Sequence, residues 1–164
     1  FMKHIISVVV RNNSSVLARV SSLFGRRGFN IDSLSVSTTQ DPHISRITVV
    51  INGDENSLDQ VVKQTTKLVD TISVTALCAD NTVARELLLV KVLVQDSDEI
   101  RRVVAMCDLY GAIILDIGSD GTMIAELTGT SAKIDEFVAE LSAKGKISEV
   151  CRTGITAMER GRQA

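Results

Sequence analysis

Residues 5–24 of the chain read IISVVVRNNSSVLARVSSLF. Five of the first six, all but Ser7, are apolar and β-branched, which predicts a strand over 5–10. The polar residues 11–15 that follow are of the kinds that begin helices. Beyond them, apolar residues recur with the spacing of one helical face, namely Val16, Leu17, Val20, Leu23 and Phe24. The stretch therefore predicts a strand that leads into an amphipathic helix, and Gly28 is placed to end that helix in a left-handed conformation.

The order of elements continues as βαββαβ to about residue 78 and then repeats. Strand patterns lie at 31–39, 44–51 and 72–78, and an apolar face after Ser57 predicts a helix capped by that residue. In the second half we expect a strand over 86–94, a helix capped by Asp96 or Ser97, strands over 113–117 and 122–127 joined by a turn at 119–121, a helix capped by Ser131 and a last strand over 146–156.

This repeated order predicts an α+β protein built of two tandem ferredoxin-like βαββαβ units. Each unit is expected to be a four-stranded antiparallel sheet with two helices on one face. We place the first domain at 1–78, a linker at 79–84 and the second domain at 85–164. Domains of this size bury little surface, and Val8, Val10 and Val50 cannot all point into one core. The sequence therefore predicts packing between domains and an obligate homodimer.

Composition argues against several classes of partner. The chain of 164 residues carries 18 Lys and Arg against 20 Asp and Glu, whereas nucleic acids and anionic membranes attract dense positive charge. Aromatic residues make up 3%, and none lies in 5–10 or 44–51, where RNA-binding domains of this order stack bases. No apolar run approaches a membrane span, no signal-peptide pattern is present, and the three cysteines are widely spaced. We therefore expect a cytoplasmic protein without nucleic-acid or membrane partners.

The sequence offers little that could perform catalysis. His4 and His43 lie in no spacing typical of metal ligands, and neither a nucleophile elbow nor a phosphate-binding loop occurs. We therefore expect no enzymatic activity, metal or cofactor of its own. Acylphosphatase-type enzymes share the element order, and Arg11 with 12–13 faintly resembles their anion-binding loop, although the glycines of that loop are missing. A small acylphosphatase-like enzyme is thus kept as an alternative.

One segment, residues 12–17, has the character of a ligand site. It places small polar residues at the start of a helix, where free N–H groups and the helix dipole attract a carboxylate. The Asn12 amide can add a hydrogen bond, and Val16 and Leu17 supply apolar surface. Such a site suits an α-amino acid with a small branched side chain, and ordinary helix capping is the alternative interpretation.

A family resemblance rests on several longer segments. RGFNIDSL at 27–34 and ELTGTS at 126–131 occur together with VLARV at 16–20, RELLLVKV at 85–92 and RTGI at 152–155. In this combination the chain, from about residue 2 to 161, resembles the regulatory small subunit of acetolactate synthase (acetohydroxyacid synthase).

The resemblance implies that the first domain is an ACT domain, a module that senses small molecules. It implies a non-catalytic regulatory subunit that activates a catalytic large subunit using thiamine diphosphate, Mg²⁺ and FAD. That enzyme condenses pyruvate with pyruvate or 2-oxobutyrate in branched-chain amino acid biosynthesis, and valine acts as feedback inhibitor. A free-standing ACT-type amino-acid sensor is the further alternative.

The resemblance also implies where the effector binds, namely between the ACT domains of two subunits. One subunit would contribute the loop before the first helix, and the other the start of the second strand. The residues implied are Asn12, Ser15, Val16 and Leu17 on the first wall, and Asn30 and Ile31 on the second. The family usually has glycine at the position of Ser15. The serine hydroxyl could bind the ligand carboxylate, or its side chain could crowd the carboxylate.

Overall fold

The computed structural model describes residues 2–161, and the chain divides into two compact units. The first unit combines residues up to Ala84 with those from Ile155 onward, and the second unit is Arg85–Gly154. Residues 155–161 thus belong to the first unit, whereas the sequence pattern predicted them in the second domain.

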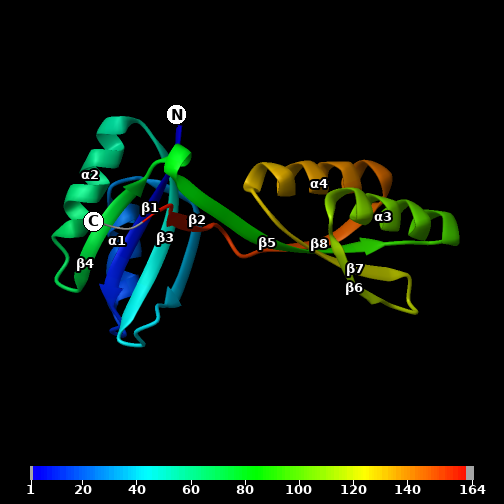
Figure 1. The fold of residues 1–164 in the computed structure, drawn as a ribbon, viewed down its shortest axis with the longest axis horizontal. Helices are drawn as coiled ribbons and strands as arrows, with labels where there is room; N and C mark the ends of the chain where they lie inside the picture. The colour runs from blue at the N-terminus through cyan, green and yellow to red at the C-terminus, as the bar shows by residue number, and fades with distance from the viewer. Residues whose placement is uncertain (1, 162–164) are drawn as a thin grey trace. The chain divides into compact units, whose positions relative to one another are not determined.

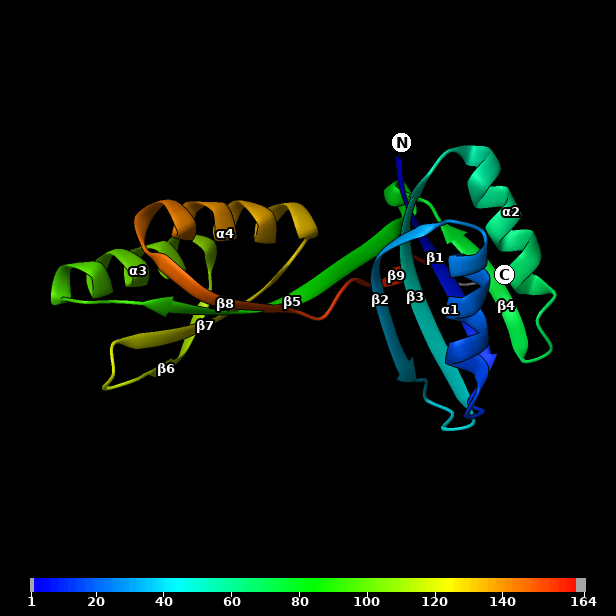
Figure 2. The same ribbon diagram turned by 180° about the vertical axis from the view of Figure 1, so that it is seen from behind.

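The first unit has the predicted βαββαβ order. Its elements are β1 (Met2–Arg11), α1 (Val16–Arg26), β2 (Asn30–Thr38), β3 (Ile44–Gly53), α2 (Glu55–Thr66) and β4 (Thr71–Leu77). The strands form an antiparallel sheet in the order β2-β3-β1-β4, and both helices cover one face of it (Figures 1 and 2). Gly28 has a φ of 73° and follows α1, as expected for a left-handed helix end.

Alternation along β1 decides which side chains enter the core of the first unit. Ile6 lies opposite Val49 and Val8 lies opposite Ile47, and all four are buried beneath the helices. Val10 joins the same cluster, together with Phe24 from α1. Strand pairing therefore resolves the conflict noted in the sequence, because Val8 and Val10 face the core and Val50 faces the other way.

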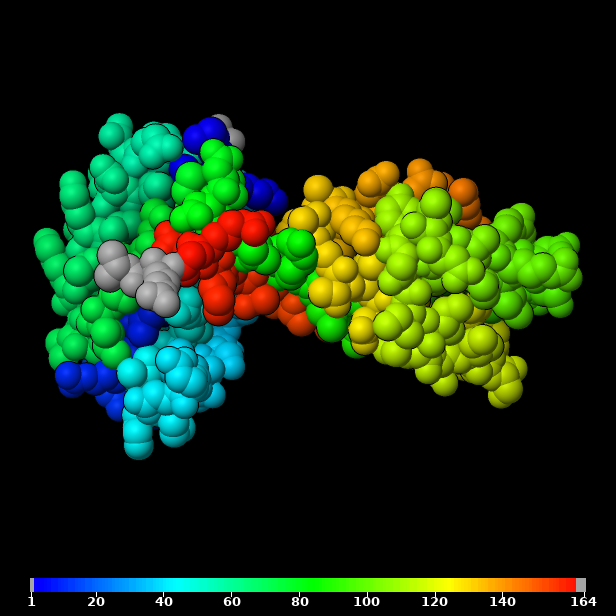
Figure 3. All heavy atoms as spheres, viewed as in Figure 1, coloured from blue at the N-terminus to red at the C-terminus, as the bar shows by residue number. Residues whose placement is uncertain are grey.

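The face of this sheet opposite the helices is covered by the chain's own C-terminal segment. Ser7, Thr48 and Val50 on that face are all buried. The Ile155 carbonyl accepts a hydrogen bond from Ser35 Oγ at 2.9 Å, and the buried Ala157 follows in β9 (Thr156–Glu159). The space-filling view shows the red C-terminal segment directly against the first unit (Figure 3). This cover comes from residues of the same unit, and packing of this sheet against a second subunit stays a prediction.

The β9 strand pairs with β5 (Thr82–Leu93), which follows a short 3-10 turn, η1 (Ala79–Asn81). The expected linker at 79–84 therefore holds that turn and the first residues of β5. The predicted strand 146–156 is in fact two strands, because Gly154 adopts a φ of 81° between β8 and β9 and breaks the extended run.

The second unit repeats the fold. After β5 come α3 (Ser97–Tyr110), β6 (Ile113–Ile117), β7 (Thr122–Gly129), α4 (Ser131–Lys144) and β8 (Lys146–Arg152). The sheet order is β6-β7-β5-β8, and alternate β5 residues Leu88, Val90 and Val92 pack into a core with Phe137 of α4. The predicted α+β architecture of two tandem ferredoxin-like units is confirmed.

Three of the four α-helices begin with a side chain that caps the backbone. Asp54 accepts from the Ser57 N–H before α2, Asp96 from the N–H groups of two residues before α3, and Thr130 from the Lys133 N–H before α4. Ser57 and Ser131 are thus not the caps that the sequence predicted. Each lies inside its helix, whereas a capping residue must precede the helix in an extended conformation.

Among residues 2–161, no helix is both long enough and apolar enough to cross a membrane.

Candidate functional site

The start of α1 differs from the starts of the other α-helices. Ser15 occupies the N-cap position, but its side chain makes no capping hydrogen bond, and the first turn contains no acidic residue. The first N–H groups of a helix have no acceptor within the helix, and they carry the positive end of the dipole. The first turn of α1 therefore has N–H groups that no side chain caps, although the Val16 N–H donates to the Asn13 carbonyl at 3.2 Å. An anion site at residues 12–17 stays a prediction.

The loop before α1 is held by contacts that the sequence did not reveal. Asn12 donates from Nδ2 to the Pro42 carbonyl at 3.0 Å and from its backbone N–H to the His43 carbonyl at 2.8 Å. The Asn12 side-chain oxygen is an acceptor of the kind that an ammonium group requires. Asn12 thus positions the loop and can also contact a ligand.

Asp70 anchors the other side of this loop. Its carboxylate accepts from Asn13 Nδ2 at 2.8 Å and from Arg19 Nη1 at 3.0 Å. Local pattern could not identify this role, because Asp70 lies 57 residues from Asn13. The Asn12 side chain thus binds the Pro42 carbonyl, and the Asn13 side chain binds the Asp70 carboxylate. The acylphosphatase alternative needs an asparagine that activates a water molecule, and these two amides are engaged with other groups of the same unit.

The two apolar residues of the first wall have different surroundings at the start of α1: one is buried and the other is exposed. Val16 is 5% exposed and packs in the core of the first unit, and its N–H already donates to the Asn13 carbonyl at 3.2 Å. Leu17 is 42% exposed and presents apolar surface beside the uncapped N–H groups.

The second wall begins β2 at the far end of the same sheet. Asn30 is exposed and lies opposite Asn52 of β3, which in turn lies opposite Lys3 of β1. Ile31 follows it and packs against the edge of the core. Asn12 directly follows the opposite end of β1, and nine residues of strand at about 3.3 Å each separate the two ends by roughly 30 Å. One copy of the chain therefore cannot bring both walls to one amino acid.

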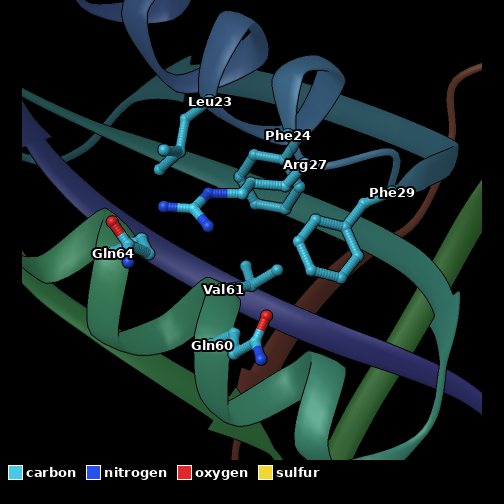
Figure 4. A pocket seen from close by; sticks show the side chains of 7 residues that line it. All are labelled: Leu23, Phe24, Arg27, Phe29, Gln60, Val61 and Gln64. Atoms are coloured by element: carbon cyan, nitrogen blue, oxygen red, sulfur yellow. The ribbon is translucent and has the colours of Figure 1, made fainter.

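A depression between α1 and α2 contains none of the predicted site residues. It is lined by Leu23, Phe24, Arg27, Phe29, Gln60, Val61 and Gln64, and it is too narrow for a water molecule. Figure 4 shows the Arg27 side chain lying across it, between the two helices. The Phe24 and Phe29 rings meet edge to face at 6.4 Å between centroids. This region is a packed helix contact and not a ligand cavity.

The second unit has a hollow of about 280 Å³ on the sheet face away from its helices, lined in part by Lys91 and Glu149. These two side chains form an ion pair at 2.8 Å. The hydrogen bond raises the pKa of Lys91 and lowers that of Glu149. Within the described range of the chain, no group of three or more His, Cys, Asp or Glu could hold a metal ion.

Comparisons with known proteins agree across the chain. The family model described as "AHAS small subunit-like ACT domain" matches residues 6–73, and that described as "Small subunit of acetolactate synthase" matches 85–161. A probable acetolactate synthase small subunit of Archaeoglobus fulgidus is 42% identical, covering 98% of both chains. The acetolactate synthase isozyme 3 small subunit of Escherichia coli is 40% identical, covering 98% of this chain and 97% of that one.

A solved structure agrees as well. The crystal structure of the acetolactate synthase small subunit from Thermotoga maritima superposes with a TM-score of 0.87 at 35% identity. The match covers 99% of this chain and 100% of that chain.

Proposed function

The chain belongs to the family of acetolactate synthase small subunits, and on that premise we propose that it confers feedback inhibition by valine through a site shared between two copies of its ACT domain. As a regulatory small subunit, it has the catalytic subunit of that enzyme as its partner. Thiamine diphosphate, Mg²⁺ and FAD belong in this proposal to the catalytic subunit. The part played by this chain is to bind that subunit and to change its activity.

The observation that carries the proposal is the position of the two walls at opposite ends of one sheet. The β2 strand lies at the edge of this sheet, where unpaired backbone groups can accept another strand. If two copies join β2 to β2 about a twofold axis, the strands run antiparallel. The Asn30 end of one copy then lies at the Thr38 end of the other, which is also the end at which α1 begins. A homodimer thus completes the site that one chain leaves divided.

Each part of valine has a matching group in such a site. The carboxylate would accept hydrogen bonds from the free N–H groups at the start of α1, with Ser15 beside it. The ammonium group would donate to the side-chain oxygen of Asn12 of one copy or Asn30 of the other. The branched side chain would pack on Leu17 and Ile31.

Regulation follows if the catalytic subunit and valine favour different packings of the two ACT domains. Valine stabilises the packing in which both walls meet, and a catalytic subunit that prefers the other packing loses activation. The coupling is reciprocal, so the catalytic subunit must weaken valine binding by the same factor, typically about 5- to 150-fold.

The test is isothermal titration of valine into the pure protein, with leucine and isoleucine for comparison. We expect saturable binding at about one site per ACT domain, weakened when saturating catalytic subunit is present. If none of the three amino acids gave a binding heat, the proposed effector site would be contradicted. Capture of the catalytic subunit by the tagged chain distinguishes a regulatory subunit from a free-standing sensor.

A further inference from the structure

Three sequence segments of the second unit that carry the family resemblance meet around one buried carboxylate. The Glu86 side chain in β5 is 4% exposed. It accepts from Ser131 Oγ at 2.7 Å and forms an ion pair with Arg152 of β8, whose Nη1 also donates to Asp135 of α4 at 2.6 Å. We call Glu86, Ser131, Asp135 and Arg152 the Glu86 cluster. It joins β5, β8 and the first turn of α4.

The Glu86 cluster lies where the chain crosses between the two units. The chain crosses once between Ala84 and Arg85 and once between Gly154 and Ile155. Inside these crossings, Leu87 of β5 and Thr153, which follows β8, are joined by two hydrogen bonds. The Leu87 N–H donates to the Thr153 side-chain Oγ1, and the Thr153 N–H donates to the Leu87 carbonyl. Every covalent path from the ACT domain into the second unit therefore passes within two residues of Glu86 or Arg152.

Because the Glu86 side chain is buried, separating it from Arg152 carries a large free-energy cost. A buried carboxylate that loses its cation is strongly destabilised, because neither water nor another charge compensates it. If β5 or β8 slid along its own axis while the other stayed in place, Arg152 would move away from Glu86. The ion pair therefore keeps the two strands in one register at the crossings, and a change of register requires the pair to break.

On the side of the ACT domain, the second crossing leads directly to the strand that carries the predicted second wall. Ile155, directly after the second crossing, accepts from Ser35 and donates to Ser33 Oγ at 3.5 Å. Both serines belong to β2, the strand that begins with Asn30 and Ile31. Ile155 is thus hydrogen-bonded to the strand of the second wall, and only Thr153 and Gly154 separate it along the chain from Arg152 of the Glu86 cluster.

We propose that the Glu86 cluster couples the ACT domain to the second unit, with Glu86 and Arg152 as positioning residues that keep the two crossing strands in register. A displacement of β2 caused by the effector pulls on Ile155, and the Glu86 cluster carries this displacement into α4 instead of letting the crossings absorb it. This inference rests on the proposed valine site.

The test uses holoenzyme reconstituted from catalytic subunit and the double variant Glu86→Gln/Arg152→Met. This variant removes both charges together and leaves no buried charge unpaired. The matched control is Lys91→Met/Glu149→Gln, which removes an ion pair between the same two strands where Glu149 is 66% exposed. We measure three quantities for each: activation without valine, the valine Kd of the small subunit alone, and the fraction of the activity that saturating valine removes.

In the double variant we expect activation to persist and the valine Kd of the small subunit alone to change less than about twofold, while saturating valine inhibits the reconstituted enzyme at least about fivefold less strongly, the lower end of typical allosteric coupling. The control should behave as the unaltered protein. Unchanged inhibition in the double variant would overturn the coupling role. Absent valine binding in the unaltered protein would instead refute the proposed function, and this inference with it.

A second variant covers the case in which the double variant does not fold. Asp135→Asn removes only the exposed arm of the Glu86 cluster and leaves the pair of Glu86 and Arg152 intact. Thermal unfolding identifies which variants are folded. A folded Asp135→Asn protein should show weaker inhibition at an unchanged valine Kd. Equal inhibition in that protein and the unaltered one would overturn the proposal.

Discussion

Ser15 is the residue at which helix stability and ligand binding compete. Ser15 has a φ of −108° and a ψ of 0°, so an aspartate there lacks the extended conformation of a capping residue. Its negative charge would still interact favourably with the helix dipole. The substitution Ser15→Asp should therefore raise the melting temperature of the protein slightly, while its negative charge repels the valine carboxylate. We expect valine binding by titration to disappear and activation of the catalytic subunit to persist.

The control for this prediction is Ser15→Gly, which restores the residue usual in the family and adds no charge. It should retain valine binding. If Ser15→Asp still bound valine with unchanged Kd, the ligand carboxylate could not lie at the start of α1.

Asn30 tests the second wall without disturbing the core. Its side chain is exposed at the start of an edge strand, so Asn30→Ala should leave the melting temperature nearly unchanged. We expect feedback inhibition to be abolished and activation to remain, as measured in assays of the reconstituted enzyme with and without valine. Asn56→Ala, an exposed asparagine in α2, is the matched control. Loss of activation with Asn30→Ala would mean that the two functions share this residue.

At the scale of elements, the cap of α2 gives the chain a defined acid sensitivity. The pKa of Asp54 is lowered, chiefly by the hydrogen bond from the Ser57 side chain and then by the Ser57 N–H. A carboxylate with a depressed folded-state pKa stabilises the protein above its unfolded pKa, and this contribution is lost as the pH falls through the folded pKa.

Melting temperatures of the unaltered protein and Asp54→Ala, compared from pH 7 to pH 3, test this effect. The variant should melt lower at pH 7, and the difference should shrink as the pH drops below about 4, where the aspartate of the unfolded chain begins to protonate. A difference that widens towards acid pH would contradict the assignment. Ser57→Ala should reproduce part of the effect, because it removes the leading cause of the shift.

The elements also show how far sequence pattern reaches. The apolar spacing from Val16 to Phe24 and the alternation around Val8 predicted a helix and a strand correctly, because both depend on neighbours in sequence. The caps at Asp54 and Thr130 were missed, since several polar residues precede each helix and only backbone conformation selects one. The ties of Asn13 to Asp70 and of Glu86 to Arg152 join residues far apart, which periodicity cannot reveal.

The same reasoning explains the misplaced C-terminal segment. The run from Lys146 to Thr156 has a continuous strand-like pattern, so it predicted one strand in the second domain. Its division at Gly154 depends on the hydrogen bonds of Ile155 with Ser33 and Ser35, more than 100 residues away. Cover for Val50 was likewise predicted, but its source could only be found from the folded chain.

At the scale of the whole molecule, the proposed effector site is divided between two copies, so the proposal makes dimerisation a requirement for sensing. A charge on an edge strand opposes pairing with a second strand. Val36 in β2 is 43% exposed, and Val36→Lys should therefore weaken pairing of two copies through β2. Light scattering at micromolar concentration should report a dimer for the unaltered protein and a monomer for this variant, and titration should show that the monomer has lost valine binding.

The other edge of the same sheet supplies the control. Ile72 in β4 is 52% exposed, so Ile72→Lys adds the same charge to an edge that the proposed dimer does not use. This variant should remain dimeric and bind valine normally. A Val36→Lys monomer that still bound valine with unchanged Kd would show that one chain suffices for the site. Because Asn12 and Asn30 lie at opposite ends of the sheet, such a site could not contain both residues, and the second wall would have to be sought elsewhere.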